Sequence, residues 1–215
     1  MGQRFFDFAE PPERRSLAAG AVLLRGFALP HEGELLAGIE AVAAASPFRH
    51  MPTRGGRRIA AEMTNCGALG WVSDRAGYRY TPLDPESGGP WPAMPAAFLR
   101  LAGEAARAAG FSGFRPDACL VNRYHPGAGM ALHRDDSEAD LAAPIVSVSL
   151  GLPIVFLFGG LERSDPVARV RLAHGDVVVW GGPARLRYHG VLPLRAGHHP
   201  AVGSCRYNLT LRRAG

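Results

Sequence analysis

Histidine and aspartate stand two positions apart at two places in this sequence, His133 with Asp135 and His174 with Asp176. Residues two apart on an extended strand point to the same side, so each pair can reach one cation. A third, distant His would complete a set of two imidazoles and one carboxylate, which leaves positions open for substrate, cofactor and oxygen. Each pair is therefore a candidate iron(II) site.

Neighbouring residues distinguish the two pairs. Gly175 separates His174 from Asp176 and the run VVVW follows, which is typical of a tight turn that starts a strand. His133 and Asp135 instead follow the loop HPGAGMAL and begin the acidic run DDSEAD, where no turn requires a His. We predict that His133 and Asp135 bind metal and that the other pair is structural.

A third ligand is expected among the distant histidines. His189 lies in the strand-like run RLRYHGVLP, whereas His198 and His199 lie in a loop with Gly and Pro that is more typical of the surface. The predicted metal ligands, and with the metal the predicted catalytic centre, are therefore His133, Asp135 and His189.

A second group of polar residues lies on the run RYNLTLR. Alternation puts its leucines and Tyr207 on one face and four polar residues on the other: Arg206, Asn208, Thr210 and Arg212. The run ACLVNRY groups Leu120, Asn122 and Tyr124 in the same way. Two desolvated Arg need anionic partners. Either an internal salt-bridge network or a bound dicarboxylate would supply them.

Short strands must position these residues. From position 118 onward the strand-like runs are separated by Gly, Pro and Asp turns, which favours a β sandwich or jelly roll; the runs are ACLVNRY, PIVSVSL, IVFLFG, VARVRLA, DVVVWG, RYHGVLPL and RYNLTLR. Helices are predicted over 32–45 and 95–109. The uncharged stretch 141–161 has the length of a membrane span, but its Gly and Pro indicate two buried strands instead.

The stretch 48–92 is expected to form hairpins and loops rather than core. It contains the basic loop TRGGRR at 53–58, whose arginines either bind phosphates or are simply solvated: Arg54, Arg57 and Arg58. It also holds four large aromatic residues: Trp71, Tyr78, Tyr80 and Trp91.

Whole-chain properties set outer limits. A length of 215 residues suits one compact unit. The net charge of +5 is compatible with a polyanionic partner, and equally with a mildly basic protein that has none. Three scattered cysteines predict neither disulfides nor a thiolate metal site and suit a reducing cytoplasm: Cys66, Cys119 and Cys205. The start, MGQRFFDFAEPPERR, predicts no export signal.

Nine segments in order resemble the AlkB family of iron(II)- and 2-oxoglutarate-dependent dioxygenases, in particular its bacterial DNA-repair members. They cover nearly the whole chain and are PFRHM, MTNCGALGW, GYRY, PWPAMP, PDACLVNRY, LHRDD, APIVSVSLGLP, HGDVVVWGG and CRYNLTLR. The resemblance implies an α+β, mainly β fold. It also implies an N-terminal segment, 1–92, that carries a nucleotide-recognition lid. A double-stranded β-helix (jelly roll) core with flanking helices follows at 93–215.

The resemblance also implies roles for individual residues. The iron ligands match His133, Asp135 and His189. The 2-oxoglutarate contacts match Asn122, Tyr124, Arg206, Asn208 and Arg212. Substrate contacts match Trp71, Tyr78, Tyr80 and Arg163. In close bacterial relatives an acidic residue faces the base two positions after the ligand Asp, and this chain has Ser137 there. Either neighbour, Asp136 or Glu138, is a candidate replacement, so the preferred base stays open.

The implied reaction is oxidative demethylation of 1-methyladenine and 3-methylcytosine in alkylated single-stranded DNA and RNA. It consumes O2, converts 2-oxoglutarate to succinate and CO2, and releases formaldehyde. A monomer in the bacterial cytoplasm, acting on the nucleoid and without membrane contact, is the expected setting. Two alternatives are the same chemistry on a protein or small-molecule substrate, and a damage binder or metal-stabilised sandwich without turnover.

Overall fold

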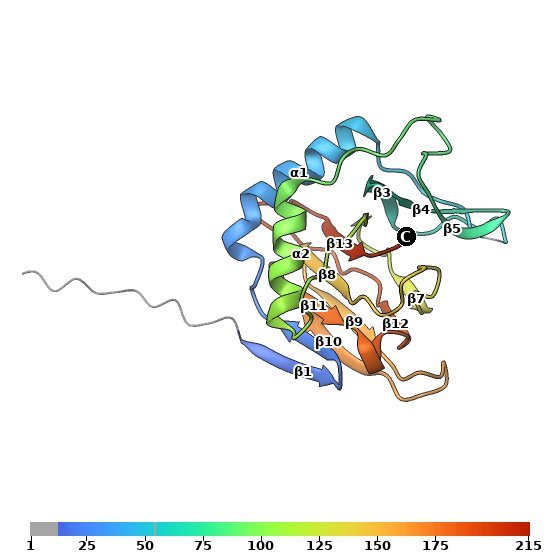
Figure 1. Cartoon of the computed structure of the whole chain (residues 1–215). Helices are drawn as coiled ribbons and strands as arrows, with labels where there is room; N and C mark the ends of the chain where they lie inside the picture. Colours follow the sequence, from blue (N-terminus) through green and yellow to red (C-terminus); the bar gives the residue numbers. More distant parts are fainter. Residues whose placement is uncertain (1–12, 54) are drawn as a thin grey trace, which may run out of the picture.

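The computed structural model describes residues 13–53 and 55–215, and it arranges them in three layers (Figure 1). Two long helices form one outer layer, a seven-stranded sheet forms the middle, and a four-stranded sheet forms the other side. Every strand pair within the two sheets is antiparallel. This arrangement confirms the expected α+β, mainly β jelly roll.

The larger sheet has the strand order β1-β2-β11-β8-β13-β6-β3. Its strands are β1 (Arg14–Ala18), β2 (Ala21–Leu24), β3 (Glu62–Gly67), β6 (Ala118–Tyr124), β8 (Ile145–Gly151), β11 (Val177–Trp180) and β13 (Arg206–Arg212). The smaller sheet has the order β10-β9-β12-β7. Its strands are β7 (Met130–His133), β9 (Ile154–Phe158), β10 (Ala168–Leu172) and β12 (His189–Val191).

Large apolar side chains fill the space between the two sheets. Leu23, Ile145 and Trp180 come from the larger sheet and Phe156 and Leu172 from the smaller one, and all are at most 5% exposed. Because side chains alternate along each strand, the opposite face of the larger sheet is free to receive the helices. Among the described residues, apolar side chains therefore form most of the core between the two sheets.

Helices α1 (Glu32–Ala45) and α2 (Ala96–Ala108) cover the outer face of the larger sheet. Their apolar sides supply Leu35, Ile39 and Phe98, which are buried against the sheet. Gly38 allows the helices to approach, because a Cβ there would lie 2.8 Å from the Phe98 ring. Both helices agree with the sequence prediction, and α2 ends just before Gly110, whose φ of +97° suits glycine. Two 3₁₀ turns, η1 (Leu29–His31) and η2 (Gly182–Ala184), complete the helical elements of the described residues.

The uncharged stretch 141–161 forms β8 and β9, as predicted, and not a single long element. Within the described residues, no helix combines the length and apolar character needed to cross a membrane. The expectation that 48–92 contributes no core was wrong, because this stretch buries residues of β3 and also Met51, Ala61, Val72 and Trp91. Strand β3 pairs with β6 at the edge of the larger sheet. It buries Met63 between the two sheets and Cys66 on the opposite face, against the helices.

A third, two-stranded sheet stands apart from both layers. It is the hairpin of β4 (Gly70–Asp74) and β5 (Gly77–Thr81), which we call the 70–81 hairpin. The side chain of Asn65 accepts from Trp71 N–H and donates to Trp71 C=O, both at 3.0 Å, and so fixes the first strand. Trp91 donates to Thr81 C=O at 2.9 Å. Among the described residues of segment 1–92, β1, β2 and β3 therefore belong to the larger sheet, whereas the 70–81 hairpin forms a separate sheet.

Candidate metal centre

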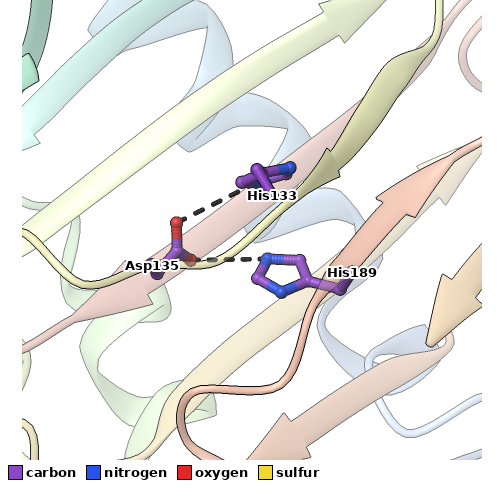
Figure 2. A group of neighbouring side chains, drawn as sticks. All are labelled: His133, Asp135 and His189. Carbon is purple, nitrogen blue, oxygen red and sulfur yellow. Dashed lines mark ion pairs between the residues drawn. The ribbon is translucent and has the colours of Figure 1, made fainter. Parts of the chain in front are cut away.

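His133 and His189 lie side by side on neighbouring strands at one edge of the smaller sheet. His133 is the last residue of β7 and His189 the first of β12, and the two are register partners with ring centres 4.5 Å apart. Asp135 follows two residues after β7 and turns its carboxylate toward both rings (Figure 2). The potential ligand atoms of the three residues lie within 4.8 Å of one another. The fold therefore brings together the three residues that the sequence singled out.

Hydrogen bonds to backbone carbonyls set the tautomer of both imidazoles. Nδ1 of His133 lies 2.9 Å from Ala131 C=O, and Nδ1 of His189 lies 3.0 Å from Arg187 C=O. A carbonyl oxygen only accepts, so each Nδ1 carries the proton and each Nε2 presents a lone pair. Nε2 lies 4.0 Å (His133) and 3.6 Å (His189) from Asp135 oxygens, too far for a strong hydrogen bond.

The charge states of these groups suit a cation. Burial, together with the neighbouring His189, lowers the pKa of His133 to about 4, so its imidazole is neutral near pH 7. Burial raises the pKa of Asp135, but the Arg212 guanidinium outweighs this and holds it well below its usual range. Two neutral imidazoles and one carboxylate are the donor set of mononuclear non-haem iron(II) sites. The residues present therefore fit the implied metal.

The other His-x-Asp pair takes the structural role that its sequence predicts. His174 Nδ1 accepts from Gly151 N–H at 2.8 Å, and Asp176 accepts from Ala173 N–H and Arg25. Gly175 between them has a φ of +81° and begins the turn before β11. Both side chains are thus engaged in holding this turn, away from the three-residue cluster.

A cavity between the two sheets is lined in part by His133 and His189. Apolar side chains of the smaller sheet line part of it. The polar residues that strand alternation grouped also line it: Asn122, Tyr124, Arg206, Asn208, Thr210 and Arg212. Asn122 and Asn208 are register partners on β6 and β13, as are Tyr124 and Arg206. The predicted cosubstrate residues therefore share one face of two neighbouring strands.

Arg206 lines this cavity and has an incomplete set of partners among the described residues. It is 2% exposed, and although its Nη2 donates to Ser149 Oγ at 2.9 Å, its Nε and Nη1 have no partner among the described residues. Burial lowers the pKa of Arg206 to about 10. A carboxylate is the ligand that such a guanidinium lacks, so the cavity fits one end of a dicarboxylate such as 2-oxoglutarate.

Arg212 is the other arginine predicted to contact a dicarboxylate. It lies nearer the three candidate metal ligands, which we call the metal cluster. Its Nη2 and Nε donate to Asp135 Oδ2 at 2.6 and 3.0 Å. The sequence left open whether the two arginines serve an internal salt-bridge network or a ligand. The structure gives a different answer for each arginine. Arg212 belongs to an internal salt-bridge network, whereas Arg206 has no such anionic partner among the described residues.

An outer pocket opens on the other side of His133 and Asp135. It is lined by most of the predicted substrate residues: Trp71, Tyr78, Ser137 and Arg163. Trp71 and Tyr78 stack with ring centres 5.4 Å apart and planes 21° apart, and Tyr78 is half-exposed. Arg163 is held beside the pocket by a 2.8 Å bond to Leu132 C=O. These aromatic faces thus stand next to the metal cluster.

Tyr80 differs from the other predicted substrate aromatics. Its hydroxyl donates to Glu138 at 2.7 Å, and burial raises its pKa. The two candidate replacements for the missing acidic residue are also engaged. Asp136 accepts from Arg134 at 2.8 Å and is exposed, while Glu138 is buried and bonded on both oxygens.

Arg185 is the residue near this site that sequence reasoning missed. It is buried after η2 and donates to the backbone of Asp135 and to Glu138. The run GGPARLRYHG contains two arginines, Arg185 and Arg187, and carries no signal that separates Arg185 from a surface Arg. In the basic loop, Arg57 and Arg58 are exposed, whereas Arg54 lies outside the described residues. Most of the N-terminal run MGQRFFDFAEPPERR, which predicts no export signal, also lies outside them.

Comparison with known proteins connects this geometry to a family. The profile of the 2OG-Fe(II) oxygenase superfamily matches residues 20–212. Alpha-ketoglutarate-dependent dioxygenase AlkB of Escherichia coli (strain K12) is 58% identical over 204 residues, covering 95% of this chain and 94% of that protein. An AlkB homolog of Caulobacter vibrioides is 47% identical over 180 residues, covering 82% of this chain and 80% of that protein.

Among solved structures, that of OsALKBH1 superposes with a TM-score of 0.76 at 26% sequence identity. The match covers 94% of this chain and 100% of that one. Sequence and fold therefore agree. This chain belongs to the AlkB family of the 2OG-Fe(II) oxygenase superfamily and is a dioxygenase that uses iron(II), 2-oxoglutarate and O2.

Proposed function

We propose that this dioxygenase demethylates N-alkylated nucleobases, chiefly 1-methyladenine and 3-methylcytosine, in single-stranded DNA and RNA. The observation that carries the proposal is the stacked pair Trp71 and Tyr78 in a pocket that reaches His133 and Asp135. Flat aromatic faces beside the metal cluster suit a flat, extruded base. Partial relatives named a tRNA demethylase and a DNA N(6)-methyladenine demethylase support a nucleic-acid substrate.

In this proposal His133, Asp135 and His189 hold the iron through the two Nε2 lone pairs and the carboxylate. Arg206 binds the distal carboxylate of 2-oxoglutarate, and the remaining contacts come from Asn122, Tyr124, Asn208 and Arg212. When bound, iron(II) and 2-oxoglutarate together supply the O2-activating chemistry, and the protein supplies position and shielding. One oxygen atom ends in succinate and the other in the N-hydroxymethyl group of the base. That group then loses formaldehyde, which restores the base.

The 70–81 hairpin acts as the nucleotide-recognition lid. A base methylated on its pairing edge is already poorly paired, so its extrusion costs less than that of a normal base. Trp71 and Tyr78 stack on the extruded base, and Arg163 lies near enough to contact it. A cationic base gains a further cation–π attraction of about 0.5–2 kcal/mol over Trp71.

A single reconstitution assay tests this function. The protein is loaded with iron(II) without oxygen and then incubated in air with 2-oxoglutarate and an oligonucleotide that carries one 1-methyladenine. Equal amounts of succinate, formaldehyde and repaired base are expected. Succinate without repaired base would move the substrate to another class, such as a protein or a small molecule. An Asp135→Ala variant should lose turnover but still bind the oligonucleotide, and loss of both would contradict a metal-binding role.

A further inference from the structure

Glu138 lies at the centre of a buried group of charged side chains beside the metal cluster. Its side chain is only 2% exposed. Oε1 accepts from Tyr80 Oη at 2.7 Å and pairs with Arg212 Nε at 3.3 Å, and Oε2 accepts from Arg185 Nη2 at 3.0 Å. Both oxygens are therefore committed to protein partners, and this carboxylate is not free to bind a substrate.

The two arginines connect Glu138 to Asp135 by separate routes. Arg212 bonds the Asp135 carboxylate with two donors. Arg185 Nη1 donates to the Asp135 backbone C=O at 2.6 Å, and its Nε donates to Ala143 C=O at 3.1 Å. Glu138 thus orients two cations, of which one fixes the side chain of Asp135 and the other its backbone.

The segment that carries Asp135 depends on such contacts for its shape. Residues 134–144 contain neither helix nor strand, so no sheet ladder fixes the direction of the Asp135 side chain. Buried ion pairs are weak contributors to net stability, because desolvation offsets their attraction. Their clearer effect is to select one geometry, and here that geometry belongs to a ligand carboxylate.

Tyr80 extends this network to the 70–81 hairpin. It lies on β5, two residues from Tyr78, but the two side chains differ. Tyr78 is half-exposed and stacks on Trp71, whereas the Tyr80 hydroxyl is bonded to Glu138. The hairpin pairs with neither of the two large sheets, so this bond is a direct polar link between the hairpin and the support of Asp135.

We infer that Glu138 is a positioning residue. Acting through Arg185 and Arg212, it holds Asp135 in a metal-binding orientation, and through Tyr80 it attaches the hairpin to the same support. The inference rests on the proposed function, since it takes Asp135 as a metal ligand. Partners that orient a metal ligand typically change metal affinity 10- to 100-fold when they are lost.

Co(II) binding to the metal-free protein tests this inference without turnover. Titration followed by the visible absorption of Co(II) should show Glu138→Gln binding about 10- to 100-fold more weakly than the unchanged protein. Asp136→Asn is the matched control, because it removes the same charge from the same segment but from an exposed carboxylate bonded to Arg134. It should bind within about twofold of the unchanged protein. Equal affinity of E138Q and the unchanged protein, or equal losses in E138Q and D136N, would overturn the inference.

Asp135→Ala separates the inference from the proposed function on which it rests. If D135A binds Co(II) as tightly as the unchanged protein, the ligand assignment itself fails. If D135A binds weakly while E138Q binds normally, only the role of Glu138 fails. Should E138Q not fold, Arg185→Lys decides in its place. A lysine keeps the charge but cannot bridge Glu138 and two backbone carbonyls, so weaker Co(II) binding supports the inference and normal binding overturns it.

The link to the hairpin has its own measurement. Tyr80→Phe keeps both arginine contacts of Glu138, so Co(II) affinity should stay within about twofold. Amide hydrogen exchange across 70–81 should accelerate about tenfold or more, because the hairpin loses its bond to Glu138. Tyr78→Phe, on the same strand, should leave that exchange rate nearly unchanged. Unchanged exchange in Y80F, or equal acceleration in both variants, would overturn this part.

Discussion

Arg206 and Tyr124 face each other as register partners on β13 and β6, with the guanidinium carbon 5.3 Å from the ring centre. The ring gives the buried cation partial stabilisation, but Nε and Nη1 of Arg206 are left without partners among the described residues. A cation in this state destabilises the ligand-free protein and favours binding of an anion.

Arg206→Met is therefore expected to raise the stability of the ligand-free protein by about 1–3 kcal/mol. Met has a side chain of similar length but lacks the unsatisfied buried polar group. The same variant should lose the stabilisation that 2-oxoglutarate gives, which is about 2.7 kcal/mol for the unchanged protein at 100 times the Kd. Thermal unfolding with and without 2-oxoglutarate measures both effects. A variant that is less stable without ligand, or that keeps the ligand-dependent shift, would contradict this account.

Trp71→Ala should weaken binding of an oligonucleotide with one 1-methyladenine by about 2- to 30-fold, corresponding to a loss of about 0.5–2 kcal/mol of cation–π attraction. Binding of the unmethylated oligonucleotide should change less, because the neutral base lacks this attraction. Fluorescence anisotropy with both oligonucleotides gives the comparison. Equal losses for the two would assign Trp71 to packing of the 70–81 hairpin.

Ser137→Asp should improve repair of cationic bases about tenfold in kcat/KM. Ser137 is exposed in the outer pocket, and the neighbouring Asp136 and Glu138 are bonded to Arg134 and to the buried network. A new carboxylate would therefore give the cationic base a charge-assisted hydrogen bond that it now lacks, about 1.5 kcal/mol. Ser137→Asn, of the same size but neutral, is the control. No gain in S137D, or the same gain in S137N, would contradict the idea that the missing carboxylate at Ser137 limits repair of cationic bases.

Asp84 and Arg49 form a two-armed ion pair, with N–O distances of 2.6 and 2.9 Å, that fixes the segment after the 70–81 hairpin. Burial raises the pKa of Asp84, but the hydrogen bonds from Arg49 and from backbone N–H lower it by more. The net result is a pKa below the ordinary value of 3.8. A lowered carboxyl pKa contributes stability above the unfolded value, and this contribution is lost as the pH falls through the folded value.

Asp84→Asn should accordingly lower the free energy of unfolding by about 1.5–3 kcal/mol at pH 7. The difference from the unchanged protein should shrink as the pH falls below about 4. Urea unfolding at pH 7, 5 and 3 measures this trend. Glu86→Gln is the control, because Glu86 is exposed and lies 3.4 Å from the same Arg. A difference that stays constant with pH would show that the carboxylate charge is not the cause.

Local sequence determined several elements almost to the residue. The run ACLVNRY is β6 and RYNLTLR is β13, because alternation reflects the two faces of an extended backbone and needs no knowledge of the partner strand. Helix α1 has its predicted bounds for a similar reason, since the spacing of its apolar residues and the Pro47 that follows it act within a few residues. Strand β3 was missed, because the sheet edge that it joins is formed by β6, more than 50 residues later.

The sequence by itself also determined which residue types form the metal cluster and that two Arg share a strand face with Asn208 and Thr210. Only the tertiary structure decided how they are used. It separated Arg206, which has donors without partners among the described residues, from Arg212, which is bonded to Asp135. It also separated Tyr78, which stacks on Trp71, from Tyr80, which is bonded to Glu138. Tyr80, Arg185 and Glu138 meet across separations of 58 and 47 residues. Such contacts follow from the path of the whole chain through both sheets, and no local pattern in the sequence encodes them.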